Sequence, residues 1–449
     1  MPYDGTKYRK AEVATIVKVC DMLPGGGKTS ASISLINSAG SNERFVFITP
    51  YKTEIARIVE KCGSRNFKAP PDLRYPIDYI MGESKLDHLH KLLSNRENVV
   101  SSHSLFIRST EETRRLIQEG GYTLILDEVV DVFQPCEFST GDMFMLLDKG
   151  VLKRDSMGVL VWDYEYEGET FRSIIERSEV CNLITSNDQD FFWMFPMDIF
   201  KCFKNCYVLT YMFEYQPLRP CFESAGIKYE LIGCRKTAEE QYEFCLAQEV
   251  DRRRDLRGLV KVVDKEKRND LGKYRTDLSM RWYKKDTKSG AEGVSALKRH
   301  VCNSLRSDMD GSGDIMWTTF ADYKTAVKGK GYSKNYLSFN QRATNEYREC
   351  TKIAYTVNVF MNPHILHHLN KIGSKPFHQD TWATSTLVQF LFRSAIRDGR
   401  PINLFIPSAR MRKLLKTWME NLASGRDLEP VEVSVPSKPR GKRGTKKED

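Results

Sequence analysis

The chain has 449 residues, of which 41% are hydrophobic and 29% are charged. This composition is typical of a soluble globular protein, and the length predicts two or three domains whose cores need neither disulfides nor metals. The longest apolar runs are strand-sized and the polar N-terminus has no signal core, so we expect a cytoplasmic protein without membrane attachment. The 69 basic residues outnumber the 59 acidic ones, a net charge of +10 that suits a polyanionic partner.

The first half of the chain alternates strand-like and helix-like stretches. Apolar residues recur from Glu12 to Met22 and predict a strand that leads into a glycine-rich loop. The elements expected after this loop are a helix over Thr29–Asn37, a strand over Arg44–Thr49, a helix over Lys52–Cys62, and strands over Leu124–Asp127 and Cys206–Thr210. Strands that alternate with helices predict an α/β fold with a largely parallel sheet flanked by helices.

The second half opens with a polar stretch that separates two domains. We assign residues 1–235 to the first domain and residues 236–312 to a charged junction or insertion. A second α/β domain is expected over residues 313–433. Residues 434–449 combine proline and glycine with six basic side chains, so we expect a disordered tail there.

The glycine-rich loop has the composition of a phosphate-binding loop. It reads Pro24-Gly25-Gly26-Gly27-Lys28-Thr29-Ser30, between the first strand and the next helix. Glycines allow backbone N–H groups to wrap a phosphate, the lysine would reach the β- and γ-phosphates, and the threonine hydroxyl would bind Mg²⁺. Met22 stands where the strict pattern has its first glycine. These residues predict a site for ATP and Mg²⁺, with a flexible turn as the alternative.

Two adjacent acids end an apolar strand about one hundred positions further on. Asp127 and Glu128 follow Leu124-Ile125-Leu126. A buried strand rarely ends on two carboxylates without a use for them. We expect Asp127 to hold Mg²⁺ and Glu128 to polarise the attacking water. An exposed strand end is the other interpretation.

Together with further segments, these motifs resemble those of superfamily 2 helicases. Their residues are most similar to those of phage or mobile-element members of that group. The segments that resemble the family's motifs follow in the expected order: Phe45–Glu54, Val99–Phe106, Val208–Met212, Trp317–Phe320, Arg342–Arg348 and Gln389–Arg397. The resemblance covers residues 11 to 416 and implies two RecA-like domains with ATP bound between them. Tyr211 and Ile396 depart from the usual residues of the third and sixth motifs.

The resemblance also implies roles for individual residues. Arg393 and Arg397 correspond to arginines that reach the γ-phosphate, although Arg397 lies one position beyond the usual one. Residues expected to contact the nucleic-acid backbone are Thr49, Pro50, His103, Thr344 and Asn345. Such contacts are mainly to phosphates, so binding would be weakly sequence-specific and salt-dependent.

The function that these features predict is an ATP-dependent helicase or translocase. DNA is favoured over RNA, replication or recombination proteins are candidate partners, and no oligomer is required. If the source is viral, the compartment is the host cytoplasm. Two alternatives stay open: a DNA-packaging motor ATPase with a nuclease lobe, and a clamp that binds nucleic acid without unwinding it.

Overall fold

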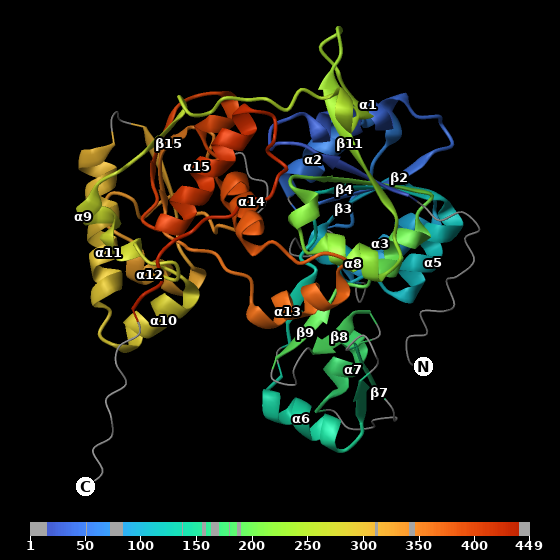
Figure 1. Ribbon diagram of the computed structural model, residues 1–449. Helices are drawn as coiled ribbons and strands as arrows, with labels where there is room; N and C mark the ends of the chain where they lie inside the picture. Colours follow the sequence, from blue (N-terminus) through green and yellow to red (C-terminus); the bar gives the residue numbers. More distant parts are fainter. Residues whose placement is uncertain are drawn as a thin grey trace. The chain divides into compact units, whose positions relative to one another are not determined.

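The computed structural model describes residues 16–50, 52–71, 84–136, 138–154, 159–162, 170–178, 180–185, 190–309, 313–340 and 346–439. Within these residues the chain divides into two compact units (Figure 1). Unit 1 contains residues 1–250 together with residues 361–377, and unit 2 contains residues 251–360 and 378–449. No helix of the described ranges is long and apolar enough to cross a membrane.

Unit 1 is organised around a sheet of seven strands in the order β12-β11-β1-β10-β4-β2-β3. Its neighbours pair in parallel except β11 and β12, which are antiparallel. The strands are β1 (Val17–Asp21), β2 (Arg44–Thr49), β3 (Val99–Ser102), β4 (Tyr122–Asp127), β10 (Asn205–Thr210), β11 (Tyr229–Lys236) and β12 (Tyr242–Leu246). The predicted parallel sheet is therefore confirmed. Because β1, β10 and β4 are parallel neighbours, their carboxyl ends lie side by side at one end of the sheet.

Helices cover both faces of this sheet. They are α1 (Lys28–Ser38), α2 (Lys52–Lys61), α3 (Lys85–Ser94), α4 (His103–Phe106), α5 (Glu111–Gly120) and α8 (Leu218–Ser224). Figure 1 shows α1 and α2 on one face and α3, α5 and α8 on the other. The predicted helices at 29–37 and 52–62 correspond to α1 and α2.

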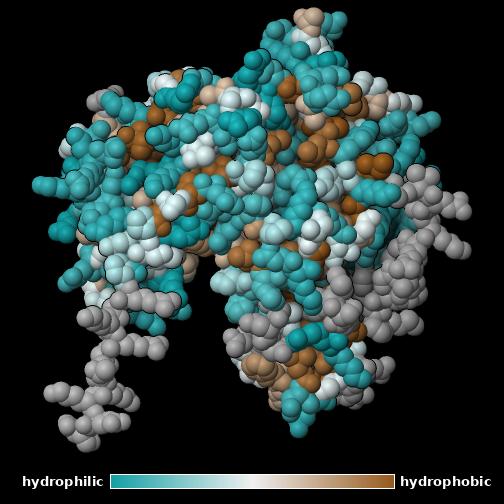
Figure 2. All heavy atoms as spheres, viewed as in Figure 1, coloured by the Kyte–Doolittle hydropathy of each residue, from teal (hydrophilic) through white to brown (hydrophobic). Residues whose placement is uncertain are grey.

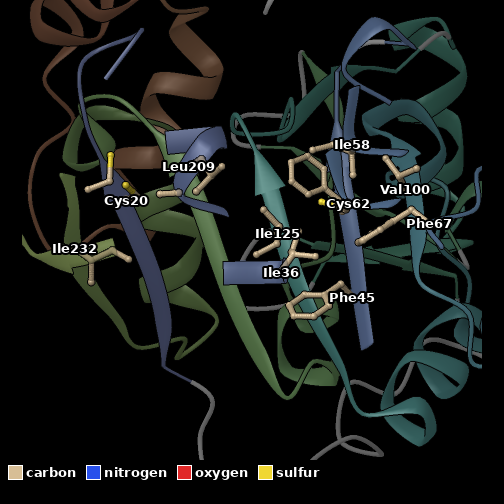
Figure 3. Close-up of a cluster of buried hydrophobic side chains, with 13 residues drawn as sticks. Cys20, Ile36, Phe45, Ile58, Cys62, Phe67, Val100, Ile125, Leu209 and Ile232 are labelled. Carbon is tan, nitrogen blue, oxygen red and sulfur yellow. The ribbon is translucent and has the colours of Figure 1, made fainter. Parts of the chain in front are cut away.

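The core beneath α1 and α2 is apolar and closely packed. Ile36 of α1 and Ile58 of α2 meet Ile125 of β4, Phe45 of β2 and Leu209 of β10 (Figure 3). All five side chains are at most 1% exposed. Burying each such side chain stabilises the unit by roughly 1.5–3 kcal/mol, so this core fixes α1 and the loop before it on the sheet.

A small antiparallel subdomain, which we did not predict, interrupts unit 1 between β4 and β10. Its strands, in the order β5-β9-β8-β7-β6, are β5 (Phe133–Pro135), β6 (Leu152–Arg154), β7 (Val159–Trp162), β8 (Asn182–Thr185) and β9 (Phe191–Met194). Helices α6 (Thr140–Asp148) and α7 (Arg172–Ser178) accompany them. Phe144 and Met145 of α6 are 44% and 47% exposed, and hydrophobic colouring reaches the surface of this subdomain in Figure 2.

Unit 2 holds a four-stranded parallel sheet in the order β13-β16-β15-β14. The strands are β13 (Val260–Val262), β14 (Asp314–Thr318), β15 (Cys350–Tyr355) and β16 (Ile402–Phe405), with helices α9 (Glu266–Asn269), α10 (Met280–Lys288), α11 (Glu292–Asn303), α12 (Lys324–Val327), α14 (Gln379–Leu391) and α15 (Ala409–Ala423). The α/β fold class, with parallel sheets flanked by helices, is thus confirmed.

One helix leaves its neighbours in the sequence. Helix α13 (Pro363–Ile372) follows β15 along the chain but belongs to unit 1, where it packs on α8. The His368 ring lies 5.9 Å from that of Phe133. The His364 imidazole is 2.5 Å from the carboxylate of Asp190.

The boundaries between the parts differ from the predicted ones. Residues 236–250 continue the first sheet as β12, and unit 2 begins at Asp251, so the stretch predicted as a junction is folded into both units. The described chain also continues past the predicted start of the tail. Val435 is 7% exposed, and the Arg275 N–H donates to the carbonyl of Pro436 at 2.8 Å. The chain is thus packed on unit 2 at Val435 and Pro436, while the side chains of residues 437–439 are exposed.

Candidate functional site

The glycine-rich loop joins the central strand β1 to helix α1. Gly25 and Gly27 have φ angles of 84° and 91°, which side-chain-bearing residues rarely adopt. Gly27 caps α1, and the Gly26 N–H donates to the carbonyl of Leu23 at 3.0 Å. Left-handed residues that alternate with right-handed ones turn successive N–H groups to one side, which makes a concavity suited to anions.

The lysine of the loop is held in place by carbonyl groups. Lys28 is 7% exposed, and its Nζ donates to the Met22 carbonyl at 2.6 Å and to the Leu23 carbonyl at 3.3 Å. The ammonium group therefore lies over the mouth of the loop with its charge solvated by the backbone.

The predicted acid of β4 meets the loop. Thr29 Oγ1 donates to Asp127 Oδ1 at 3.4 Å, although 98 positions separate the two residues. The approach follows from topology, because β1 and β4 are parallel and flank β10, so both end at the same edge. A hydroxyl and a carboxylate side by side offer the oxygen ligands that Mg²⁺ prefers.

Two residues predicted to contact nucleic acid lie against the same acid. Thr49 Oγ1 donates to Asp127 Oδ2 at 3.5 Å, and His103 Nε2 lies 2.9 Å from the Asp127 carbonyl. Both side chains are buried. They come from the ends of β2 and β3, so the turns after those strands are connected to Asp127. Sequence reasoning missed these contacts.

The second acid has an unusual backbone. Glu128 has a φ of 65°, and its N–H donates to the Leu209 carbonyl at 2.9 Å. A left-handed glutamate costs of order 1–3 kcal/mol, and such strain is concentrated at functional sites. The turn directs Glu128 out of the strand, directly after Asp127.

Asp21 is a further residue that the sequence analysis did not identify. It ends β1, is 2% exposed, and accepts the backbone N–H groups of Met212 at 2.7 Å and Phe213 at 2.8 Å. Met212 is itself left-handed, with a φ of 57°. This carboxylate fixes the segment after β10 to the strand that carries the loop. An acid at the end of the loop strand was the available signal.

A pair of thiols lies beneath the loop. Cys20 of β1 is fully buried in the core shown in Figure 3. Its hydrogen bond with Cys234, followed by burial, raises the pKa of the Cys20 thiol, which therefore stays protonated. Cys234 in turn donates to the Gly26 carbonyl at 3.1 Å. The same hydrogen bond with Cys20 lowers the pKa of the Cys234 thiol.

The predicted arginines lie in unit 2. Arg393 follows α14 and is 4% exposed, and its backbone N–H donates to the Phe390 carbonyl at 3.1 Å. Arg397 lies in a short 3₁₀ turn, Ala395–Asp398, and is partly buried. Pro50 is partly exposed at the end of β2. Thr344 and Asn345 lie outside the described residues. In the described part of the chain, no group of three or more His, Cys, Asp or Glu side chains could hold a metal.

Fold and site together define an α/β protein of two parallel-sheet units, the first of which carries a glycine-rich strand–loop–helix beside a strand-end acid. The chain belongs to the YonV family. It is 36% identical, over 420 residues, to the SPbeta prophage-derived protein YonV of Bacillus subtilis (strain 168). The aligned region covers 90% of this chain and 99% of that protein. The family described as the YonV C-terminal Rossmann-like domain matches residues 254–419, within the span of unit 2 and α13.

Three solved structures resemble the chain more distantly, each at 10% identity. Xpd4 of S. tokodaii has a TM-score of 0.43 and covers 90% of this chain and 94% of its own. The DUF1998 helicase MrfA, bound to DNA and AMPPNP, has a TM-score of 0.33 and covers 94% and 49%. The yeast DEAD-box splicing factor Prp28 has a TM-score of 0.22 and covers 93% and 78%. Likeness at this level does not define an activity.

Proposed function

We propose that unit 1 binds and hydrolyses ATP with Mg²⁺, and that the chain uses this hydrolysis to move along or separate the strands of a nucleic acid. The observation that carries the proposal is the meeting of Thr29 and Asp127 at 3.4 Å beside the buried Lys28. Three residues from two distant segments gather at the carboxyl ends of the parallel strands β1 and β4. A turn that only connected β1 to α1 would not require Asp127 to contact Thr29.

The residues present fit the nucleotide and its metal. The loop from Pro24 to Ser30 would take the phosphates with its backbone N–H groups and the N-terminus of α1. Lys28 would exchange the carbonyls that it now contacts for phosphate oxygens. Thr29 and Asp127 would hold Mg²⁺, which neutralises phosphate charge when bound.

The remaining steps fall to side chains around Asp127. Glu128 would orient the attacking water and accept its proton. Thr49 and His103 would position Asp127, because each hydrogen bonds to it. The same two residues stand in segments that we predict to contact a nucleic-acid backbone. Binding at those turns would therefore reach Asp127 directly, which supports hydrolysis stimulated by nucleic acid.

The nucleic acid itself is proposed on separate grounds. Pro50, Thr344 and Asn345 remain predicted backbone contacts, and the net charge of +10 suits a polyanion. DNA is our choice over RNA because the YonV relative is prophage-derived. The roles of Arg393 and Arg397 at the γ-phosphate remain predictions.

The test is hydrolysis of ATP by the full chain with single-stranded, duplex and forked DNA and RNA. We expect the rate to rise with nucleic acid in wild type, to be lost in Lys28→Ala, and to be lost in Glu128→Gln with ATP binding retained. Lys61→Ala and Glu60→Gln are matched controls, because these side chains are 58% and 72% exposed on the surface of unit 1. Hydrolysis that survives in Lys28→Ala would exclude this loop as the catalytic site.

A nuclease assay with Mg²⁺ or Mn²⁺ distinguishes the packaging-motor alternative, which predicts cleavage of DNA. Nucleic-acid binding without any hydrolysis would instead indicate the clamp.

A further inference from the structure

An antiparallel hairpin stands at the loop edge of the sheet in unit 1. Strand β11 is parallel to β1, and β12 returns antiparallel with Lys236 opposite Tyr242 and Cys234 opposite Phe244. Because β11 runs in the same direction as β1, its end and the start of β12 lie level with the glycine-rich loop. Figure 1 shows this hairpin beside α1.

Both strands of the hairpin touch the loop. A Cβ atom placed on Gly27 would lie 2.1 Å from Cδ1 and 2.2 Å from Cε1 of Tyr242. The tyrosine ring therefore occupies the space where any other residue would carry its side chain. From the neighbouring strand, Cys234 donates to the Gly26 carbonyl at 3.1 Å. The hairpin contacts the two glycines that precede Lys28.

A groove runs from this contact along α1. Its volume is about 930 Å³, and α1 contributes Ala31 and Leu35 to its walls while the hairpin contributes Tyr242 and Phe244. The rings of Tyr207 and Phe244 stack with their centroids 5.3 Å apart. Lys18 is 5.3 Å from the Tyr207 ring centroid. The size is within the range of small-molecule sites, and the aromatic rings suit a planar ligand. Charged side chains also line the groove, namely Lys18, Glu230, Arg235, Glu239, Glu243 and Glu249.

We propose that Tyr242 and the adjoining end of this groove hold the nucleoside of the triphosphate whose phosphates lie in the glycine-rich loop. The inference rests on the proposed nucleotide site. Phosphates bound at Gly27 and Lys28 leave the sugar and base to continue past the first turn of α1. Tyr242 is a partly exposed aromatic side chain that touches this turn and lines the groove. Aromatic side chains stack on nucleobases of any identity, because every base has a flat π-face.

The experiment compares two ligands of the full chain, ATP and inorganic tripolyphosphate, by calorimetry. Both would occupy the loop, but only ATP has a nucleoside. We expect wild type to bind ATP more tightly than tripolyphosphate. Tyr242→Ala should weaken ATP binding about tenfold or more, the loss of one stacking contact, and leave tripolyphosphate binding unchanged. Tyr242→Phe should stay close to wild type.

Two further variants keep the result interpretable. Tyr242→Leu fills the space beside Gly27 without an aromatic ring, so it replaces Tyr242→Ala if that variant does not fold. Tyr274→Ala removes a partly buried tyrosine of unit 2 and should change neither affinity. Equal weakening of both ligands would overturn the inference, because Tyr242 would then support only the loop. Unchanged ATP binding in Tyr242→Ala would overturn it too. Wild type that binds neither ligand would refute the nucleotide site itself.

Discussion

Replacing Gly27 with alanine tests the structure of the loop without any ligand. Gly27 combines a φ of 91° with the Tyr242 ring 2.1 Å from the position of an added Cβ. Real Cβ atoms do not approach other atoms so closely, so the ring or the loop has to move. Backbone strain and steric overlap therefore act at the same residue.

The size of the effect follows from these two terms. A left-handed backbone costs an alanine roughly 1–2 kcal/mol. Overpacking against the ring adds roughly 1–3 kcal/mol. Gly27→Ala should therefore lower the free energy of unfolding of unit 1 by roughly 2–5 kcal/mol.

The assay is urea unfolding of the full chain without nucleotide. Gly121→Ala is the matched control, because Gly121 has a φ of 63° and nothing lies within 4 Å of its added Cβ. It should cost only the backbone term, about 1–2 kcal/mol. In a Tyr242→Ala background, the overlap is absent and Gly27→Ala should cost about 1–3 kcal/mol less than in wild type. Equal costs at Gly27 and Gly121, or no relief by Tyr242→Ala, would refute the reasoning.

Four more predictions concern other parts of the chain. Burial lowers the pKa of His368 from 6.5 to about 4, so the imidazole binds a proton more readily in the unfolded chain than in the folded one. Unit 1 should therefore lose about 3 kcal/mol of stability as the pH falls from 6.5 to about 4. Urea unfolding of His368→Phe should show a flatter pH dependence over this range. Asp21→Ala should cost roughly 2–6 kcal/mol in the same assay, because two buried N–H groups lose their acceptor, and a cost below about 1 kcal/mol would contradict this. Arg397→Ala should slow hydrolysis with ATP affinity unchanged, and an unchanged rate would remove Arg397 from the site. Deleting residues 440–449, which include five Lys or Arg, should weaken nucleic-acid binding and its salt dependence; binding equal to wild type at low salt would rule out a role for this segment.

The central strands of the sheet in unit 1 could be predicted because their apolar pattern is a local property of the sequence. Strands β2 and β4 are buried along nearly their whole length and appear in the sequence as uninterrupted apolar runs. Other elements lack such a signal. In β12, Tyr242 and Phe244 alternate with Glu243. The surrounding sequence is charged, so this strand resembles a linker unless its packing against α1 is known. The antiparallel subdomain is built of strands of three or four residues, which are too short to show a clear periodicity.

The candidate site was predictable in its residues and not in its contacts. Lys28 and Asp127 were identified by residue type and spacing, and the structure brings the neighbouring Thr29 to Asp127. The contacts of Thr49 and His103 with Asp127 depend on the order β4-β2-β3 in the sheet, which no local pattern specifies. Tyr242 at Gly27 depends on a hairpin that returns across α1. These side chains become visible only when the topology is known.

Helix α13 has a practical consequence for dissecting the molecule. A fragment that ends at Val250 would contain the whole seven-stranded sheet and the loop, yet it would expose the surfaces of α8 and Phe133 that α13 covers. Unit 2 without residues 361–377 would need its chain rejoined between β15 and α14. An isolated fragment of unit 1 should therefore be made by supplying α13 as a separate peptide or by grafting it after Val250, and its solubility would report whether α13 is bound.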